Sequence, residues 1–509
     1  MNSSRQRRLG AVLSYINILV ATLIGLIYTP FLLKILGQNE YGLYSLILAL
    51  MSFLAILDLG FGNSIVRFNS KFRALKDENG VAQLNGLFVI LYSSMAMISL
   101  IIGYFLYTNF ELLIGSSLTV NEVNKAKVMF GILILNLAFT LFMSIYNSLL
   151  IAYEKFVVMQ SLNLFKTLTL PLIMTPLLLI GYKSISLVLI TAILNIIALI
   201  IASIYCYKQI KIQISFKNIQ FNLFKDISVY SFFILINILV DKLYAPTSQY
   251  ILGITVGTAA VAIYAIGIQF TSYFTTLSTS LNSVFLPRIT HLVVEDNKKE
   301  ISNIFVKIGR LQFIILAFVL SGFFLFGKEF IVLWAGEDYV NSYYIALIIM
   351  FPALIPLSQN IGIVILQAKN RMQFRVLLYL VLAVINVFLS YFLSIELNEI
   401  GPALSMFIAN LFGQILIMNY YYYKYIEINI PRYWKEIFGI SIIIIAITSV
   451  VFIIKYYVLE HALNNWLTLG LAIITYVIIL CSCLFKFVFN EYEKELLTSL
   501  IRRFRRSKK

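Results

Sequence analysis

Fourteen apolar stretches, each about long enough to cross a bilayer, follow one another through this sequence with few polar residues between them. A bilayer core of roughly 30 Å takes about 20 helical residues, whereas barrel strands alternate over about ten residues. These stretches are apolar on all faces, and a chain with 61% hydrophobic and 12% charged residues lacks the charge that a soluble surface needs. We therefore predict an all-α integral membrane protein with about 14 transmembrane helices, near residues 11–33, 42–64, 84–107, 128–151, 160–181, 185–207, 228–253, 259–286, 304–326, 343–366, 376–395, 401–423, 437–457 and 466–489.

The basic residues alternate between the two sides that these spans define. With the amino terminus in the cytoplasm, 31 of the 39 Lys and Arg residues fall on the cytoplasmic side, six fall outside, and Lys166 and Lys242 lie within spans. This asymmetry is the positive-inside pattern of membrane proteins. It predicts a multi-pass protein of the cell (inner, cytoplasmic) membrane with both termini in the cytoplasm. The net charge of +16 is explained by the basic residues that flank the spans on the cytoplasmic side. We therefore expect no nucleic-acid partner.

A short internal pattern predicts a repeat. In segments 36–67 and 252–288, a Leu-Gly pair precedes a Tyr, and an Arg follows that Tyr after 23 or 24 residues. The two segments lie six predicted helices apart and run in the same direction, as a parallel repeat of six spans requires. We predict an N-terminal six-helix bundle at 1–210, a C-terminal six-helix bundle at 211–425, and two additional helices with a basic cytoplasmic tail at 426–509.

Enzyme chemistry has little support in the sequence. The predicted loops are too short to hold a catalytic domain. The stretch from Gly322 to Lys328 spells GxxxxGK, but Glu329 replaces the Ser or Thr that would hold magnesium. The two histidines, His291 and His461, lack metal-ligand spacing. We therefore expect that the protein is not an enzyme, and that it has no cofactor, no metal site and no catalytic residues.

Polar side chains recur at helical spacing in the fourth, seventh and eighth spans, and others lie in and just after the tenth. Within a membrane, polar groups face a cavity or form hydrogen bonds between helices, which stabilise by about 0.6 kcal/mol each. Bonding between helices is sufficient to explain any single stripe, but stripes in both halves favour a polar cavity shared by the two bundles. The predicted cavity residues are Asn136, Asn147, Asn237, Tyr244, Thr271, Thr275, Asn282, Asn360, Gln367 and Arg371.

Charged residues add candidates for an anionic cargo. Arg67 and Arg288 occupy matching positions of the repeat, where they would face each other across the cytoplasmic mouth as forked donors, although the positive-inside rule alone also places an Arg there. Asp241 and Lys242 lie about 20 Å into the seventh span at 1.5 Å per residue. Asp58 lies near the cytoplasmic end of the second span, where Gly60 can loosen the helix. Each of these charges requires a cavity or a partner.

Four segments carry a family resemblance: YTPFLLKILGQNEYGLYSLILALMSFLAILDLGFGNSIVRF at 28–68, DKLYAPTSQYILG at 241–253, AIYAIGIQF at 262–270 and LQAKNRMQFR at 366–375. Through them, essentially the whole chain resembles the Wzx-type polysaccharide flippases. The same superfamily, that of the multidrug, oligosaccharidyl-lipid and polysaccharide exporters, also holds the multidrug-and-toxin exporters and the peptidoglycan-precursor flippases. The family often has an Asp where this chain has Ser248, so an ion-coupling role cannot be carried to that position.

The resemblance implies two six-helix bundles around a central cationic cavity, with two extra helices. It implies a flippase that moves polyprenyl-diphosphate-linked oligosaccharide repeat units, such as those of O-antigen or capsule, from the cytoplasmic to the outer leaflet by alternating access. Arg67, Lys242 and Arg288 would bind the diphosphate, and Asp58 and Asp241 are candidates for ion coupling. The expected partners are this glycan lipid, membrane lipid and polysaccharide polymerase machinery; the oligomeric state stays open.

Two alternatives remain at this stage. A cation-coupled exporter of drugs or metabolites would have the same architecture, although the cationic cytoplasmic mouth disfavours it. A membrane glycan polymerase would act on the same lipid-linked glycans. Such an enzyme usually needs a large external loop, and the longest one predicted here, about residues 108–127, has few residues that could be catalytic.

Overall fold

The computed structural model describes residues 3–114, 117–217, 221–242, 244–279, 282–459, 463–491 and 493–495. This part of the chain is helical and contains no strand, so that the all-α prediction is confirmed. Two compact units divide the chain. Unit 1 comprises Met1–Ala265 with Ser394–Asn398, and unit 2 comprises Ile266–Leu393 with Glu399–Lys509. The predicted domain bounds at 210 and 425 stay a prediction.

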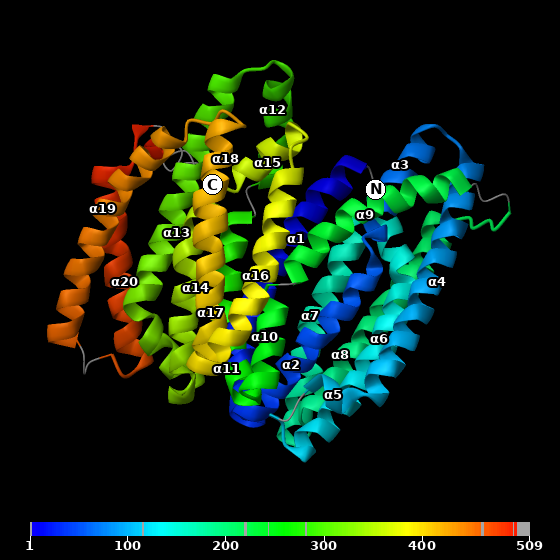
Figure 1. Cartoon of the computed structure of the whole chain (residues 1–509), viewed down its shortest axis with the longest axis horizontal. Coiled ribbons are helices and arrows are strands. Elements are labelled where there is room, and N and C mark those ends of the chain that lie inside the picture. The colour runs from blue at the N-terminus through cyan, green and yellow to red at the C-terminus, as the bar shows by residue number, and fades with distance from the viewer. Residues whose placement is uncertain are drawn as a thin grey trace, which may run out of the picture. The chain divides into compact units, whose positions relative to one another are not determined.

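Unit 1 contains ten complete helices among its described residues, the first part of α11 and two short helical turns (Figure 1). Their bounds are α1 Ser3–Leu36, α2 Gln38–Leu54, η1 Ala55–Asp58, α3 Phe61–Ala74, α4 Glu78–Thr108, α5 Phe110–Ile114, α6 Val120–Ala152, α7 Phe156–Leu179, α8 Ser184–Tyr205, η2 Cys206–Ile210, α9 Phe221–Lys242, α10 Ala245–Thr255 and α11 Thr258–Thr279.

Unit 2 begins within α11 and contains the later helices, apart from residues 394–398. Their bounds are α12 Asn282–Val294, α13 Lys298–Ala335, η3 Glu337–Tyr339, α14 Val340–Ser358, α15 Ile361–Ala368, α16 Gln373–Leu397, η4 Asn398–Ile400, α17 Gly401–Ala409, η5 Asn410–Ile417, α18 Met418–Lys424, α19 Ile430–Ile454, η6 Lys455–Leu459, α20 Trp466–Cys483 and η7 Leu484–Val488.

Twelve helices in the described part of the chain are long and apolar enough to cross a membrane. One of them, Gln373–Lys424, is 52 residues long and includes two of the predicted spans, which the turn η4 joins. The predicted span 228–253 falls on α9 and on the short α10, and the predicted span 259–286 continues beyond the end of α11. The membrane prediction is confirmed, whereas the count of fourteen and the two-bundle layout stay predictions.

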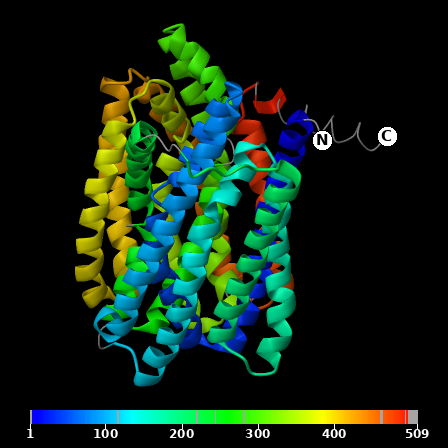
Figure 2. The ribbon, with the colours of Figure 1, turned by 90° about the vertical axis from the view of Figure 1, so that its right-hand side faces the viewer.

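Aromatic side chains fill the interior of each unit. In unit 1, α6 runs alongside both α4 and α8 (Figures 1 and 2). The ring centroid of Phe61 of α3 lies 6.2 Å from that of Phe88 and 6.0 Å from that of Tyr92, both of α4. In unit 2, Phe305 of α13 packs edge to face on Tyr433 of α19 at 5.5 Å. Edge-to-face pairs are favoured by the ring quadrupoles. Aromatic packing of this kind stabilises the interior of each unit.

Candidate functional site

In unit 2, a helix breaks inside a predicted membrane span. Helix α14 contains Pro352 and Pro356 and ends at Ser358, and α15 begins at Ile361. Each proline lacks the N–H that would continue the helical hydrogen bonds, so the helix is weakened at this point. The turn between the helices consists of Gln359 and Asn360, whose exposed fractions are only 2% and 7%. The break therefore brings two carboxamide side chains into the interior of the unit.

The side chains of the turn are held by hydrogen bonds. Asn360 Nδ2 donates to Ser278 Oγ of α11 at 2.6 Å, and Ser278 Oγ donates to the Leu357 carbonyl at 2.6 Å. Gln359 Nε2 donates to Asn419 Oδ1 of α18 at 2.8 Å. Buried amides that bond in this way are fixed in orientation, because an unmade bond would leave a buried polar atom unsatisfied. The predicted cavity residue Asn360 is thus part of a rigid polar cluster.

A small pocket of about 50 Å³ opens beside this turn. It is lined by Pro356, Leu357, Gln359, Asn360, Ile363, Arg375, Tyr379, Gln414, Met418 and Tyr422. The Arg375 guanidinium lies 4.2 Å from the centre of the Tyr379 ring. Its Nε is buried without a hydrogen-bond partner, and no carboxylate forms an ion pair with Arg375 among the described residues.

A half-buried arginine without a carboxylate partner is able to bind an anion. A guanidinium binds phosphate through parallel N–H bonds, and a half-buried cation without a carboxylate partner leaves that capacity unused. The pocket is small beside the usual ligand sites of roughly 300–1,000 Å³, so a glycan lipid would need a wider opening at Arg375 than this conformation has.

A second polar cluster surrounds the predicted coupling residue Asp58 in unit 1. The residue ends the turn η1, and Leu59 and Gly60 follow with φ of 51° and 72°. This left-handed conformation favours glycine and ends the helix before α3 begins. The Asp58 carboxylate interacts with Tyr92 and Ser144, from α4 and α6. In the described part of the chain it forms no ion pair.

A third cluster joins α6 to α8 in unit 1. Asn195 Nδ2 donates to Asn136 Oδ1 at 3.2 Å and to Thr140 Oγ1 at 2.8 Å. Asn136 is a predicted cavity residue, whereas Asn195 was not among the predicted site residues. The geometry is that of hydrogen bonding between helices, which is the alternative that the polar stripes left open.

The two roles of Asn136 can be separated. If it only joins the helices, replacing either Asn136 or Asn195 by alanine should lower the free energy of unfolding by about 0.6 kcal/mol and leave transport unchanged. Thermal denaturation of the purified variants, with transport assayed in parallel, checks this expectation. A transport defect in Asn136→Ala alone, at equal stability, would assign Asn136 to the cargo pathway instead.

The other predicted site residues are divided between the two units. Arg67 belongs to unit 1 and Arg288 to unit 2, and their pairing stays a prediction. Arg288 is exposed and lies 3.7 Å from Glu300, and Arg371 Nη1 donates to the Tyr425 carbonyl at 3.4 Å.

The remaining positions differ in exposure. The predicted side chains that are exposed are Arg67, Asn147, Arg288, Gln367 and Arg371. The half-buried ones are Lys242 and Tyr244. Thr271 and Thr275 donate to carbonyls of their own helix. Three predicted side chains lie outside the described residues: Asn237, Asp241 and Asn282.

Sequence reasoning missed Arg375 as a site residue, together with Tyr379, Gln414 and Tyr422. From the sequence, Arg375 is one of the cytoplasmic basic residues and the last residue of the family segment at 366–375. The available signal was the spacing of Arg375 and Tyr379, which are four residues apart on α16 and so share a helix face. The partners Gln414 and Tyr422 come from a distant segment, and no spacing in the sequence connects them to Arg375.

Comparisons with known proteins bear on what this fold does. A family model described as "Polysaccharide biosynthesis protein" matches residues 10–293, more than half of the chain. The chain belongs to this family. Among curated proteins, it is 20% identical over 409 residues to the "Putative O-antigen transporter" of Shigella flexneri, covering 79% of this chain and 94% of that protein.

Solved structures share the fold of this family member. The inward closed conformation of the lipid II flippase MurJ matches with a TM-score of 0.73 and 16% identity, covering 94% of this chain and 99% of that one. An inward-facing multidrug resistance transporter of the MATE family matches with a TM-score of 0.68 and 12% identity, covering 84% and 99%. With the family match, the predicted resemblance is confirmed, and the fold is the one that these flippases and exporters have. By their names these relatives are transporters and flippases, not enzymes. This chain is a multi-pass membrane protein.

Proposed function

We propose that the chain is a flippase that moves polyprenyl-diphosphate-linked oligosaccharide repeat units from the cytoplasmic to the outer leaflet of the cell membrane. The observation that carries this proposal is its membership of the polysaccharide biosynthesis protein family, in a chain with the fold of flippases and exporters. The name of the Shigella flexneri relative, an O-antigen transporter, points to the same class of cargo. In this role the chain serves polysaccharide biosynthesis, with both termini in the cytoplasm and polymerase machinery acting on its product.

The cargo has three parts that need different surroundings. Its diphosphate is anionic and suits Arg375, together with the predicted Arg67, Lys242 and Arg288. Its glycan suits the carboxamides and hydroxyls of the polar stripes, and its polyprenyl tail stays in lipid. Moving the diphosphate outward follows an inside-negative potential, which is worth about 2.3 kcal/mol per charge per 100 mV. The potential alone can therefore drive transport.

Alternating access requires a seam that opens on the outer side, and unit 1 contains a candidate. At the end predicted to lie outside, Ser117 Oγ donates to the Gly253 carbonyl at 2.5 Å. Thr258 Oγ1 donates to Glu122 Oε1 at 2.7 Å. A Cβ on Gly42 would lie 1.8 Å from the Thr258 carbonyl oxygen. These contacts join α2, α6 and the loop before α6 to α10 and α11. The two sets belong to different bundles in the predicted repeat, so outward opening would have to break these contacts.

The test is the distribution of lipid-linked glycan in cells that lack the protein. Lipid extracts are analysed by mass spectrometry, and a membrane-impermeant probe reports the leaflet of any polyprenyl-diphosphate glycan. Accumulation in the inner leaflet, reversed when the gene is restored, is the expected result. An unchanged lipid pool would contradict the proposal.

The same experiment separates the alternatives. A MATE-type exporter, which the fold match favours as the second candidate, would leave the glycan lipids unchanged and alter drug sensitivity. A polymerase would leave completed but unpolymerised units in the outer leaflet. The structure fills part of the predicted external loop 108–127 with α5, and a capping box of Thr119 and Glu122 begins α6, which leaves fewer residues for a catalytic site than the sequence indicated.

Ion coupling at Asp58 gives a further prediction. If a proton or sodium ion binds there, Asp58→Asn should lower gradient-driven transport about tenfold, because coupling between sites typically changes affinity 5- to 150-fold. Transport into vesicles is measured with and without an imposed gradient of each ion. Asp226→Asn, at an exposed position of α9, is the matched control. Unchanged gradient dependence in Asp58→Asn, and in its combination with Asp241→Asn, would show that neither aspartate couples transport to an ion.

A further inference from the structure

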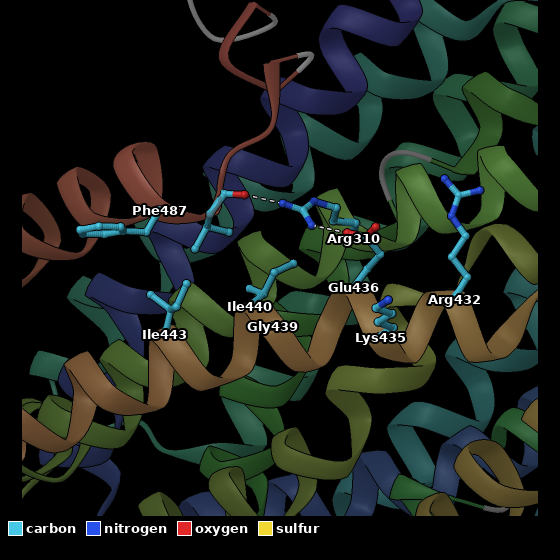
Figure 3. Close-up of a pocket in the computed structure, with 9 residues that line it drawn as sticks. Arg310, Arg432, Lys435, Glu436, Gly439, Ile440, Ile443 and Phe487 are labelled. Carbon is cyan, nitrogen blue, oxygen red and sulfur yellow. Dashed lines mark hydrogen bonds and ion pairs between the residues drawn. The ribbon is translucent and has the colours of Figure 1, made fainter.

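A second pocket in unit 2 lies apart from every residue proposed above. It has a volume of about 490 Å³ and lies between α13, α19 and the turn η7 (Figure 3). Its lining residues are Arg310, Arg432, Lys435, Glu436, Gly439, Ile440, Ile443, Phe487 and Val488. This volume falls within the usual range of small-molecule sites, roughly 300–1,000 Å³.

The pocket has a basic end and an apolar end. Figure 3 shows Arg432 and Lys435 at one end and Phe487 and Ile443 at the other. Phe487 of η7 is 63% exposed. Trp434 is also exposed, and it lies in the first turns of α19 together with Arg432 and Lys435. Exposed apolar and aromatic side chains next to basic ones are typical of the interface between lipid head groups and acyl chains. The pocket thus has the polarity of an amphiphile.

The charges of the pocket do not cancel. Arg310 is bound within the protein: its Nη1 lies 2.5 Å from Glu436 Oε2, its Nε lies 2.8 Å from Glu493 Oε1, and its Nη2 donates to the Val488 carbonyl. Glu436, the one carboxylate among the lining residues, is therefore neutralised by Arg310. Even with Glu493 counted, Arg432 and Lys435 leave a surplus of positive charge.

The two remaining cations are available to a ligand. Arg432 Nη1 donates to Asn303 Oδ1, a neutral acceptor, at 2.7 Å, which leaves its other N–H groups and its whole charge. Lys435 has no ion pair or hydrogen bond to any described residue. A guanidinium and an ammonium three residues apart on one helix face can bind one phosphate together.

We propose that this pocket binds an anionic phospholipid, with the phosphodiester head group at Arg432 and Lys435 and an acyl chain along Ile443 and Phe487. Basic pockets between transmembrane helices on the cytoplasmic side are suited to anionic head groups. The amphiphilic lining favours a lipid over a free anion, because inorganic phosphate would leave the apolar end unused. The proposal does not depend on the cargo, since the pocket lies in helices beyond the residues 10–293 that match the family.

Binding is tested with the full chain purified in detergent, stripped of lipid and titrated with phosphatidylglycerol under native mass spectrometry. The double variant Arg432→Gln/Lys435→Gln should bind the lipid about tenfold more weakly, because each basic residue near an anionic head group contributes binding energy. Gly439→Leu should weaken binding to a similar degree. A Cβ at Gly439 meets nothing within 4 Å, so a larger side chain fills the pocket without displacing protein atoms.

The controls make each outcome decisive. Gly470→Leu, at a position of α20 where a Cβ also meets nothing within 4 Å, should bind phosphatidylglycerol like the wild type. Phosphatidylcholine, which has no net charge, should bind at least tenfold more weakly than phosphatidylglycerol. Equal binding by the wild type and both pocket variants would overturn the proposal. Displacement of the lipid by inorganic phosphate or by polyprenyl diphosphate would also overturn it, indicating a free-anion site or a cargo site, respectively.

Discussion

Replacing Arg375 by glutamine is expected to slow transport of the lipid-linked glycan about a hundredfold while the protein stays folded. The guanidinium lies beside a buried polar turn and has a buried Nε without a hydrogen-bond partner among the described residues. Loss of a charged, half-buried partner of an anion costs about 3 kcal/mol, which corresponds to roughly a hundredfold in affinity. The measurement is inner-leaflet accumulation of the glycan lipid in cells that carry only the variant.

Two further variants separate charge from fold. Arg375→Lys keeps the charge but loses the planar fork, so we expect an intermediate defect of about tenfold. Arg8→Gln makes the same change at an exposed position of α1 and should transport like the wild type. Equal thermal stability of the three variants excludes misfolding. Wild-type rates in Arg375→Gln would remove this pocket from the cargo pathway.

The fold was predictable because membrane helices are specified by local composition. Runs of about 20 apolar residues leave the backbone no partner except its own helix, so length and hydropathy suffice. The same property limits the prediction. In such a run nothing in the sequence marks where α11 ends at Thr279, and only Pro246, in the first turn of α10, marks how α9 and α10 divide a predicted span.

Candidate site residues were predicted less completely. The reason is that the sequence does not show whether a residue of a membrane helix faces lipid or a neighbouring helix. Asn136 was selected as a polar group inside a span, and its role in a cavity stays a prediction; its partner Asn195 is 59 residues away on another helix. Arg375 follows the positive-inside pattern, which places many arginines near helix ends without any role in binding. Arg375 differs from those arginines because it lines a pocket together with Gln414 and Tyr422. That pocket forms only when the helices pack together, so the sequence does not reveal it.

Replacing Gly42 by valine is expected to abolish transport by preventing closure of the seam between α2 and α11. A Cβ at this position would lie 1.8 Å from the Thr258 carbonyl oxygen and 3.2 Å from the Ala262 nitrogen. Both neighbours are backbone atoms, which cannot rotate away as a flexible side chain can, so the two helices have to separate. Overpacking of this kind costs about 3 kcal/mol, enough to shift an equilibrium between closed and open states about a hundredfold.

The shift can be measured as thiol accessibility in a background where Cys206, Cys481 and Cys483 are replaced. Ala262 is fully buried beside Gly42, so a cysteine introduced there should react slowly with an impermeant maleimide in the otherwise unchanged protein. With Gly42→Val the rate should rise at least tenfold, whereas Gly470→Val should leave it unchanged, since a Cβ at Gly470 meets nothing within 4 Å. Slow labelling together with normal transport in Gly42→Val would mean that this seam tolerates the added side chain. The contacts of Gly42, Ser117 and Thr258 would then join helices that stay together throughout transport, and the moving boundary would have to lie elsewhere in the chain.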